Sequence, residues 1–325
     1  MAVFTTLDEN DISQFIDSYG IGDLIAFKGI SDGIENSNYF ITTSSHHLAE
    51  ETGHKQQGEY VLTLLEELPA EHLPFHVRLL DTLSGHGLPV PYILRNHNGE
   101  AIGCLRNKPA IIATRLPGRH ATTPDNEQCA AVGQALADIH LAAAELPDNH
   151  RGIRDRQWFQ SCIDDASVWL NDHDQQWVQN IFSAYKAIAA DDLPQGIIHG
   201  DLFRDNVFFQ GNKLTGIIDF YNAGAGHLLF DIAVAVNDWC RNDSGIDQAR
   251  MDALTGAYNT RRALTDKERK NWPLMLKVSA MRFWLSRILA NRSYERHNEL
   301  YIEKDPEQFL RLLQWHCRND SALTG

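Results

Sequence analysis

The sequence lacks any long run of apolar residues. No window approaches the roughly 20 apolar residues that a membrane-spanning helix needs. The first ten residues, MAVFTTLDEN, contain neither the basic region nor the apolar region of a secretory signal. We therefore expect no membrane span, no membrane partner and no export signal.

Cysteine is scarce and unpaired. The five cysteines are odd in number, lie far apart and show none of the close spacings typical of metal sites: Cys104, Cys129, Cys162, Cys240 and Cys317. This pattern argues against a disulfide framework and against a zinc site. It favours a protein of the reducing cytoplasm.

The chain also has fewer positively charged than negatively charged residues. Lysine and arginine number 29 against 43 aspartates and glutamates, which gives a formal net charge of −14. Such a chain is repelled by nucleic acid and by anionic membranes, so neither is an expected partner. By contrast, apolar residues make up 43% of the chain and include 14 Phe, 9 Tyr and 7 Trp, which is enough to form a core. At 325 residues the length suggests two domains.

The first third of the chain has an α+β pattern. Apolar residues at helical spacing precede Gly20, a residue typical of a helix C-terminus. Strands are expected over 24–28, 39–42, 59–67 and twice within 102–116, with a long hairpin connection after 43 and a helix over 73–83. Pro117 and Gly118 then interrupt the pattern, so we place the domain boundary between 116 and 117.

The remainder, 117–325, is mainly helical. Thr123 is expected to cap a helix whose first residue is Pro124. Further helices are expected over 155–171, 174–190, 228–239, 247–259, 266–292 and 306–317. Between them lies a β-rich segment in which Gly211-Asn212 predicts a two-residue hairpin turn.

That β-rich segment carries the chemistry. His199-Gly200-Asp201 is followed five residues later by Asn206, and the hairpin then leads to Ile217-Ile218-Asp219-Phe220. Phosphoryl transfer needs a carboxylate to orient and deprotonate the attacking hydroxyl. It also needs amide and carboxylate oxygens to hold Mg²⁺ against the phosphates. The hairpin should return Asp219 to the side of Asn206.

Each motif alone is weak, because a short HxD or a lone Asp before Phe is usually a turn or a capped helix. Together, HxDxxxxN, a hairpin and IIDF form a much more specific pattern. His199 is expected to support the loop by hydrogen bonding to backbone rather than to contact substrate.

These segments resemble the catalytic and metal-binding segments of the aminoglycoside phosphotransferase/choline kinase superfamily. The resemblance extends over essentially the whole chain. Within the superfamily, GIENSNYF, YVLTLLEE, LPVP, FDIAVAVNDWC and MRFWLSR resemble the kinase-like homoserine kinases of bacteria.

The resemblance implies a bilobal protein-kinase-like α+β fold. A small N-terminal antiparallel sheet lobe, 1–116, would bind ATP, and a larger helical lobe, 117–325, would carry catalysis and substrate binding. It further implies that Asp201 is the catalytic base, that Asn206 and Asp219 bind Mg²⁺, and that Asp231 holds the catalytic loop.

Residues for the nucleotide are expected in the first lobe. The loop between the first two strands offers backbone N–H groups to the phosphates, and the adenine is expected between the lobes, against Ile111 and the linker. The residues expected to bind ATP are Gly29, Ser31, Gly33, Asn36, Ser37, Ile111, Thr114 and Leu116.

The third strand departs from the superfamily pattern. Where kinases of this fold usually carry a lysine for the α- and β-phosphates, this chain has Thr63. A substitute cation is therefore required, and Lys28, Arg106 and Arg204 are candidates.

By the same resemblance the acceptor is L-homoserine, phosphorylated for threonine biosynthesis. Its carboxylate needs a cation, for which Arg282 or Arg287 is proposed, and its ammonium needs an acid, for which Asp238 is proposed. Each of these residues has an alternative interpretation as a structural link between helices. Two alternative functions stay open: a kinase of another hydroxyl acceptor (an aminoglycoside, choline or an amino alcohol), or a non-catalytic nucleotide-binding regulator.

Overall fold

The computed structural model describes residues 4–30, 36–45, 57–66, 68–146, 150, 152, 156–188, 192–297, 305–319 and 323, without the side chains of 70 and 293–297. The chain divides into an N-terminal unit, Met1–Leu116, and a C-terminal unit, Pro117–Gly325. None of the helices in these residues carries an apolar stretch of the length that a membrane span requires.

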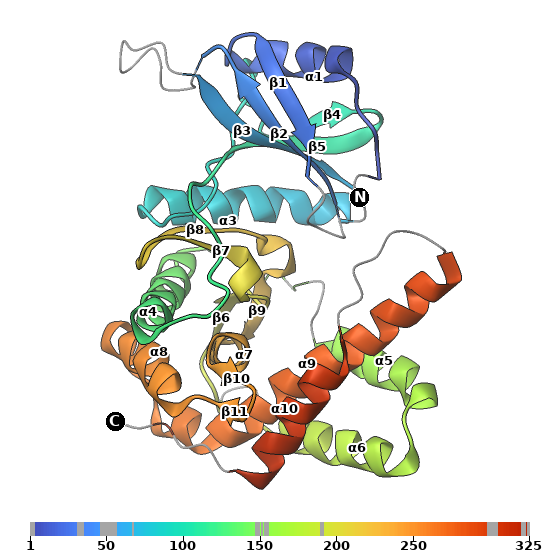
Figure 1. Ribbon diagram of the computed structural model, residues 1–325, viewed down its shortest axis with the longest axis vertical. Helices are drawn as coiled ribbons and strands as arrows, with labels where there is room; N and C mark the ends of the chain where they lie inside the picture. Colours follow the sequence, from blue (N-terminus) through green and yellow to red (C-terminus); the bar gives the residue numbers. More distant parts are fainter. Residues whose placement is uncertain are drawn as a thin grey trace. The chain divides into compact units, whose positions relative to one another are not determined.

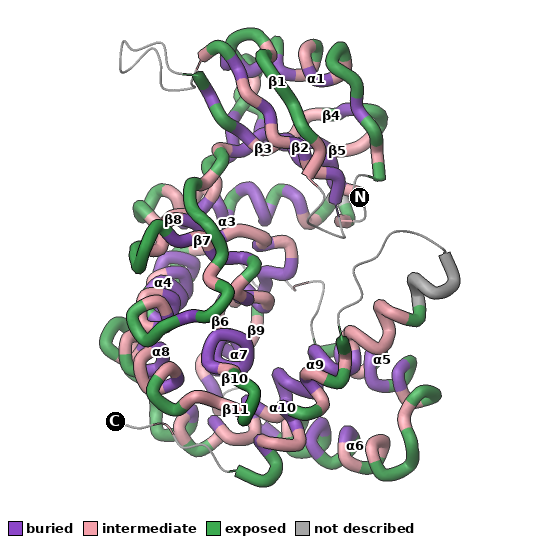
Figure 2. The backbone as a smooth tube through the Cα atoms, in the orientation of Figure 1, coloured by how far each residue is buried: buried purple, intermediate pink, exposed green. Residues whose placement is uncertain are grey.

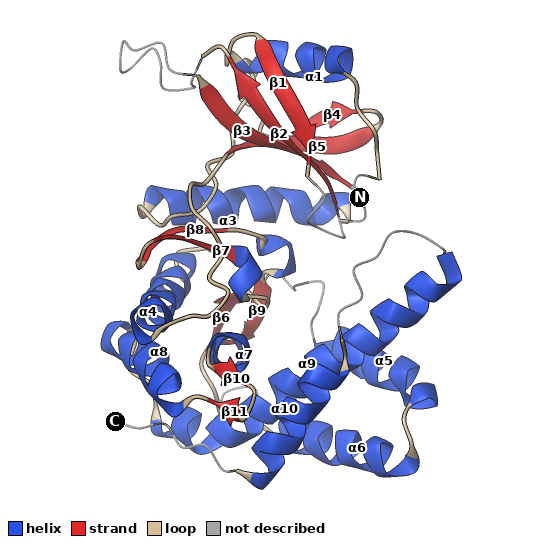
Figure 3. Ribbon diagram, in the orientation of Figure 1, coloured by secondary structure: helices blue, strands red, loops and turns tan. Residues whose placement is uncertain are grey.

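The N-terminal unit is built on a five-stranded antiparallel sheet with the strand order β1-β2-β3-β5-β4 (Figures 1 and 3). The predicted long hairpin connection joins β2 to β3, which pair from Thr43 with Gly58 to Asn36 with Leu65; residues 46–56 of that connection lie outside the described residues. The elements are α1 (Glu9–Ile16), η1 (Asp17–Tyr19), β1 (Leu24–Gly29), β2 (Asn36–Thr43), β3 (Gly58–Leu65), η2 (Ala70–His72), α3 (Leu73–Gly85), β4 (Gly103–Leu105) and β5 (Lys108–Thr114).

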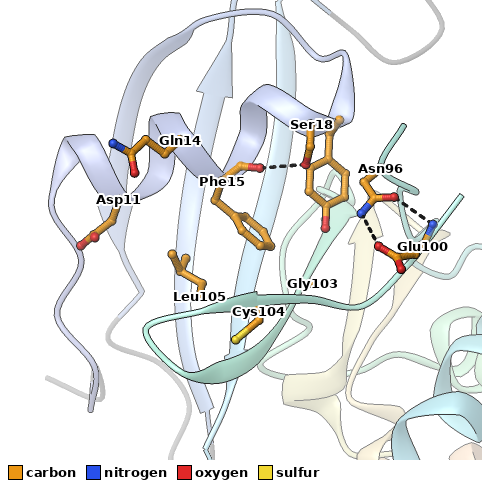
Figure 4. Close-up of a pocket in the computed structure, with 10 residues that line it drawn as sticks. Asp11, Gln14, Phe15, Ser18, Asn96, Glu100, Gly103, Cys104 and Leu105 are labelled. Carbon is orange, nitrogen blue, oxygen red and sulfur yellow. Dashed lines mark hydrogen bonds between the residues drawn. The ribbon is translucent and has the colours of Figure 1, made fainter. Parts of the chain in front are cut away.

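Helix α1 covers one face of this sheet. Asp8 and Asp11 form a capping box at its start, and Gly20 adopts a left-handed conformation after η1, as the sequence predicts. Ile12 and Ile16 pack with alternate strand residues such as Leu62. Figure 4 shows Phe15 of α1 pointing toward β4, beside a surface pocket formed entirely by this unit.

Because side chains alternate along a strand, the second face of the sheet carries the other residues of each strand. Thr63 pairs with Ile111 on β5 and with Asn38 on β2, whose side-chain oxygen accepts a hydrogen bond from Thr63 at 2.7 Å. Lys28 pairs with Phe40 and lies on the same face. This face is the one that lacks α1.

The C-terminal unit is mainly helical, and α7 forms its centre. Every residue of α7 is buried (Figure 2). Helices α4 and α8 pack closely because Gly133 lies against the backbone of Leu254, where an added Cβ would come within 2.0 Å of the Leu254 carbonyl oxygen. The helices are α4 (Asn126–Ala143), α5 (Arg156–Ala166), α6 (Asp172–Lys186), α7 (Leu228–Trp239), α8 (Gln248–Arg261), α9 (Asp266–His297) and α10 (Glu307–Arg318), with a short η3 (Ser167–Trp169) after α5.

One predicted helix start is wrong. Helix α4 begins at Asn126 and not at Pro124, and its N-cap is Asp125 rather than Thr123. The Asp125 carboxylate accepts from the Gln128 N–H at 2.8 Å, and the Gln128 side chain accepts from the Asp125 N–H at 3.2 Å. This capping box satisfies two backbone donors, which a single threonine hydroxyl cannot do.

Short strands of the C-terminal unit form three two-stranded ladders. The predicted hairpin at Gly211-Asn212 is present, with Val207 paired to Ile217. The remaining elements are β6 (Gln195–Ile198), η4 (Arg204–Asn206), β7 (Val207–Gln210), β8 (Lys213–Ile217), η5 (Phe220–Asn222), β9 (Gly224–His227), β10 (Arg241–Asn242) and β11 (Gly245–Ile246). The predicted α+β fold class, a small antiparallel sheet followed by a mainly helical part, is thereby confirmed.

Candidate active site

The segment 199–206, which we call the catalytic loop, leaves β6 and enters β7. Asp231 of α7 binds its first two backbone N–H groups: the carboxylate accepts from His199 at 2.7 Å and from Gly200 at 2.8 Å. Gly200 has φ +78°, a conformation that favours glycine, and an added Cβ would come within 3.2 Å of the Asn222 carbonyl oxygen. The sequence HGD therefore folds into a tight turn around one buried carboxylate.

The carbonyl groups of the loop are bound as well. Arg282 of α9 donates from Nη1 to the Gly200 oxygen at 2.8 Å, and Trp239 of α7 donates from Nε1 to the Leu202 oxygen at 3.0 Å. The Asn206 Nδ2 donates to the Asp201 oxygen at 2.8 Å. Helices α7 and α9 thus fix the loop from outside, which is the kind of preorganisation that phosphoryl transfer requires.

His199 lies inside this arrangement and is fully buried. Its Nε2 is 3.0 Å from the Ile218 carbonyl oxygen, and its Nδ1 accepts from the Asp201 N–H at 3.3 Å. Burial lowers the pKa of His199, so the imidazole is neutral with its proton on Nε2. These contacts are of the backbone-supporting kind that the sequence suggests for His199.

Asp201 itself is half-buried. Within the described residues, no side chain donates a hydrogen bond to its carboxylate, and its backbone is held on both sides. A carboxylate placed in this way can accept a proton from a substrate hydroxyl.

Asn206 and Asp219 lie at the same end of the β7–β8 hairpin. They precede Val207 and follow Ile217, which are paired, and the Ile218 N–H donates to the Asn206 oxygen at 2.9 Å. Asp219 has φ 66° and ψ 54°, a left-handed conformation in which Asp is enriched among non-glycine residues. Such backbone costs about 1–3 kcal/mol and clusters at functional sites.

The oxygen donors of Asn206 and Asp219 suit Mg²⁺, which prefers few protein ligands together with phosphate oxygens. The described residues contain no group of three or more His, Cys, Asp or Glu side chains arranged for a metal. An amide and a carboxylate completed by a nucleotide's phosphates do not require such a group.

Asp231 is further bound by a histidine that the sequence analysis did not single out. His140 of α4 lies 3.0 Å from the Asp231 carboxylate through Nε2, and both side chains are buried. Burial alone would raise the pKa of Asp231, but the hydrogen bond from His140 contributes to a net lowering. The only signal in the sequence was a histidine next to the buried position Ile139.

The three residues predicted for the acceptor all lie in the C-terminal unit. Arg282 is 3% exposed and contacts the catalytic loop, with Trp158, Phe230 and Phe283 rings around its guanidinium. Arg287 donates to the Asp305 carbonyl oxygen at 3.0 Å and to Gln308 at 2.8 Å, and so links α9 to α10.

Asp238 at the end of α7 accepts from Arg204 three times: from the backbone N–H at 2.8 Å, from Nε at 3.1 Å and from Nη2 at 3.3 Å. Arg241 lies 3.6 Å away. Two cations therefore already compensate this carboxylate. These contacts favour the structural alternative for Asp238 over an ammonium site.

In the N-terminal unit, Ser31 and Gly33 lie outside the described residues. Asn36 and Ile111 share the face of Thr63, whereas Ser37 points to the opposite face, where it accepts from the Thr5 N–H at 2.9 Å and contacts Glu66. Only the backbone of Ser37 could therefore serve a nucleotide on the face of Asn36.

At the end of β5, Thr114 already uses hydrogen-bonding groups that were expected to bind the nucleotide. The Thr114 N–H donates to the Tyr92 oxygen at 2.9 Å, and the Thr114 hydroxyl accepts from the Tyr92 N–H at 3.0 Å. Gly29 ends β1, and Leu116 ends the unit. The nucleotide-binding roles expected of Gly29 and Leu116 stay predictions.

The candidate cations occupy different places. Arg106 forms ion pairs with Asp11 at 2.7 Å and Asp8 at 3.6 Å, on the side of α1. Lys28 lies on the opposite face, with Thr63. A further pair, Lys108 with Glu66, was not predicted, and it lies on the α1 side together with Ser37.

The fold is that of the small-molecule kinases. An amicoumacin kinase in complex with AMP-PNP, Ca2+ and Ami has a TM-score of 0.70 and 13% sequence identity, covering 96% of this chain and 93% of that chain. A choline kinase from Cryptosporidium parvum has a TM-score of 0.64 and 12% identity, covering 96% and 95%. At these identities the likeness shows the fold alone.

The sequence shows the family. The profile of the Phosphotransferase enzyme family matches residues 26–264, and the chain belongs to this family. A homoserine kinase of Burkholderia lata is 40% identical over 337 residues, 99% of this chain and 98% of that protein. A homoserine kinase of Methylobacillus flagellatus is 39% identical over 315 residues, 97% and 95%. The resemblance seen in HGDLFRDN and GIIDF is thus confirmed.

Proposed function

We propose that the protein transfers the γ-phosphoryl group of ATP to the hydroxyl of L-homoserine, giving ADP and O-phospho-L-homoserine. The observation that carries the proposal is the identity of about 40% with homoserine kinases over nearly the whole chain. The C-terminal unit supports it, because Asn206 binds the Asp201 backbone and the β7–β8 pairing brings Asp219 to the same end of the hairpin as Asn206.

In this proposal Asp201 orients the acceptor hydroxyl and takes its proton. Asn206 and Asp219 hold Mg²⁺, which when bound neutralises charge on the phosphates. Asp231, His199 and Arg282 keep the loop backbone in place. Positioning and electrostatics do most of the work, because little covalent chemistry falls to the protein.

For the nucleotide we propose the loop that starts at Gly29 and ends at Asn36, together with Ile111 and the backbone of Leu116. Of the cations that could replace the missing strand lysine, the contacts in the N-terminal unit favour Lys28. It lies on the face of Thr63 and Ile111, whereas Arg106 is paired on the side of α1. Arg204 is bound to Asp238.

For the acceptor carboxylate we propose Arg282 or Arg287. Arg282 binds the carbonyl oxygen of Gly200, the residue before Asp201. An arginine fork matches a carboxylate by two parallel hydrogen bonds.

The two alternatives make different demands on the chain. An aminoglycoside kinase would require a broad acidic cleft for a polycationic substrate, and a choline kinase an aromatic cage. A non-catalytic regulator would have no need of a positioned base, yet Asp201 is held on both sides of its backbone.

The test is a coupled ADP-release assay with MgATP and a panel of acceptors: L-homoserine, L-threonine, choline, an aminoglycoside and 3-aminopropanol. We expect turnover with L-homoserine and a phosphomonoester product visible by phosphorus NMR. Turnover with another acceptor alone would replace the substrate. ATP binding without turnover on any acceptor would favour the regulator.

We further propose that the product feeds threonine biosynthesis in the reducing cytoplasm. None of the five cysteines forms a disulfide, although Cys104 and Cys317 are exposed. Free exposed thiols are typical of proteins from reducing compartments.

A further inference from the structure

A chain of buried hydrogen bonds extends from the catalytic loop to the start of α9. His140 Nδ1 lies 2.7 Å from the Tyr258 hydroxyl, and Arg262 Nη1 lies 3.3 Å from the same oxygen. Arg262 also donates to Glu268 Oε1 at 2.9 and 3.0 Å. With Asp231 these residues form what we call the His140 chain, in which the Asp231, Tyr258 and Glu268 side chains are fully buried.

The His140 chain ends at the N-terminus of α9. The Glu268 carboxylate accepts from the Thr265 N–H at 2.9 Å, and the Thr265 hydroxyl accepts from the Glu268 N–H at 3.2 Å. This is a capping box at the start of α9. Arg262 is therefore anchored to a helix terminus at one end and to Tyr258 at the other.

Donors and acceptors fix the direction of every bond. Arg262 can only donate, so the Tyr258 oxygen accepts from it. Burial raises the pKa of Tyr258 far above its ordinary value, so Tyr258 keeps its proton and donates it to His140 Nδ1. The Asp231 carboxylate only accepts, so the proton of His140 is on Nε2.

The result is a neutral His140 in a single tautomer, with the hydrogen bonds from Arg262 through Tyr258 and His140 directed toward Asp231. Hydrogen bonds in such a series polarise one another. The charged or titratable groups around His140 are Asp231 on α7, His199 on the catalytic loop, Tyr258 and Arg262 at the end of α8, and Glu268 on α9. Of these, Tyr258 and Arg262 touch no part of the catalytic loop.

We propose that Tyr258 and Arg262 are positioning residues of the transfer reaction: they set the tautomer of His140, which orients Asp231 against the backbone of His199 and Gly200. The proposal rests on the proposed kinase function for its kinetic test. Tyr258 contacts His140, and Arg262 contacts Tyr258 and Glu268, so each acts on the rate through the geometry of the loop that carries Asp201.

The first experiment needs no variant. Nitrogen NMR of the histidine side chains in the full-length protein should find His140, assigned by its loss in His140→Gln, with hydrogen on Nε2 only. A His140 that carries its proton on Nδ1 overturns the proposal.

The second experiment compares Tyr258→Phe with Thr255→Val. Both remove one buried hydroxyl from α8, but among the described residues the Thr255 hydroxyl bonds only to the Met251 carbonyl of its own helix, at 2.8 Å. Tyr258→Phe should lower kcat by about 3- to 30-fold, the effect of residues coupled to a site through a network, and change both KM values by less than about twofold. The Nδ1 signal of His140 should shift, because Nδ1 loses the hydrogen bond from Tyr258.

Thr255→Val should keep the wild-type kcat and the wild-type His140 signals. Equal kcat values in the two variants, with an unchanged His140 spectrum, would overturn the proposal. If the wild type turns over no acceptor, the proposed kinase function fails, and the NMR measurement alone decides on the His140 chain.

Discussion

Asp231 in the C-terminal unit and Glu66 in the N-terminal unit each accept several hydrogen bonds, and the two carboxylates bind different kinds of donor. Asp231 in the C-terminal unit binds the backbone N–H groups of His199 and Gly200 and a neutral histidine. Glu66 in the N-terminal unit binds the side chains of Lys108, Ser37 and Thr5.

The difference indicates what each network is for. Backbone contacts from Asp231 determine the shape of a loop, so any change there should alter a reaction rate. Side-chain contacts from Glu66 join the end of β3 to β2, β5 and the chain before α1, so a change there should alter stability. The predictions below separate these two kinds of effect, from the largest to the smallest.

The largest effect is expected at the loop itself. Asp201→Asn should lower kcat by about 10²–10⁴-fold, the usual contribution of a positioned base, because an amide cannot take the hydroxyl proton. MgATP affinity should change little. The neighbouring exposed Asp205→Asn is the matched control and should keep its turnover. Wild-type turnover in Asp201→Asn would show that another group is the base.

A change at the proposed metal site should weaken MgATP binding and not only slow the reaction. Asp219→Ala removes a proposed Mg²⁺ ligand, and MgATP affinity should fall by at least about 10- to 100-fold, the range already seen for residues that only support a ligand. Calorimetry with and without Mg²⁺ measures this. An affinity that keeps its wild-type value and its metal dependence would exclude Asp219 as a ligand.

The sequence predicted the parts of the site that are local in the chain. HGD, Asn206 and IIDF lie within 22 residues, 199–220, and one two-residue turn is enough to bring them together. The fold class followed from strand and helix periodicity for the same reason. Here short-range patterns and tertiary contacts agree.

The contacts that the sequence did not predict are distant in the chain. His140 and Asp231 are separated by 91 positions, and Lys108 and Glu66 by 42. Periodicity marks such residues as buried or strand-forming but says nothing about which helix or strand lies opposite. The sequence does not show that Asp238 pairs with Arg204, because this contact depends on how α7 packs against the loop. For that reason Asp238 was predicted to bind the substrate.

A moderate effect is expected for the acceptor site. Arg287→Ala or Arg282→Ala should raise the homoserine KM by about 10- to 100-fold, the cost of about 1.5–3 kcal/mol for a charged hydrogen bond, and spare the KM for ATP. Because Arg282 also binds Gly200, its variant should lose kcat as well.

The control for both is Arg292→Ala, an exposed arginine of the same helix that stacks on Trp169. Amino alcohols without a carboxylate should be poor substrates of the wild type and lose little further activity in the variants. If both alanine variants fold and keep the wild-type homoserine KM, the carboxylate binds elsewhere.

The smallest effect is expected in the N-terminal unit. Burial raises the pKa of Glu66, but hydrogen bonds from Lys108, Ser37 and Thr5 outweigh it and lower the pKa below its ordinary value of 4.5. A carboxylate with a lowered folded-state pKa adds stability above its unfolded-state pKa and loses it as the pH falls through the folded-state value. Glu66→Gln should therefore reduce the free energy of unfolding at neutral pH and converge with the wild type in acid.

We expect a loss of about 1–2 kcal/mol in urea denaturation at pH 7, since a hydrogen bond to a charged group contributes about 1.5–3 kcal/mol and Lys108 is partly solvated. The kcat should not change. Glu59→Gln on the same strand, whose partner Arg115 is exposed, should lose less than about 0.5 kcal/mol. If Glu66→Gln instead lowers kcat at unchanged stability, the Glu66 network serves the reaction, and the Asp231 and Glu66 carboxylates do not differ in the way that their contacts indicate.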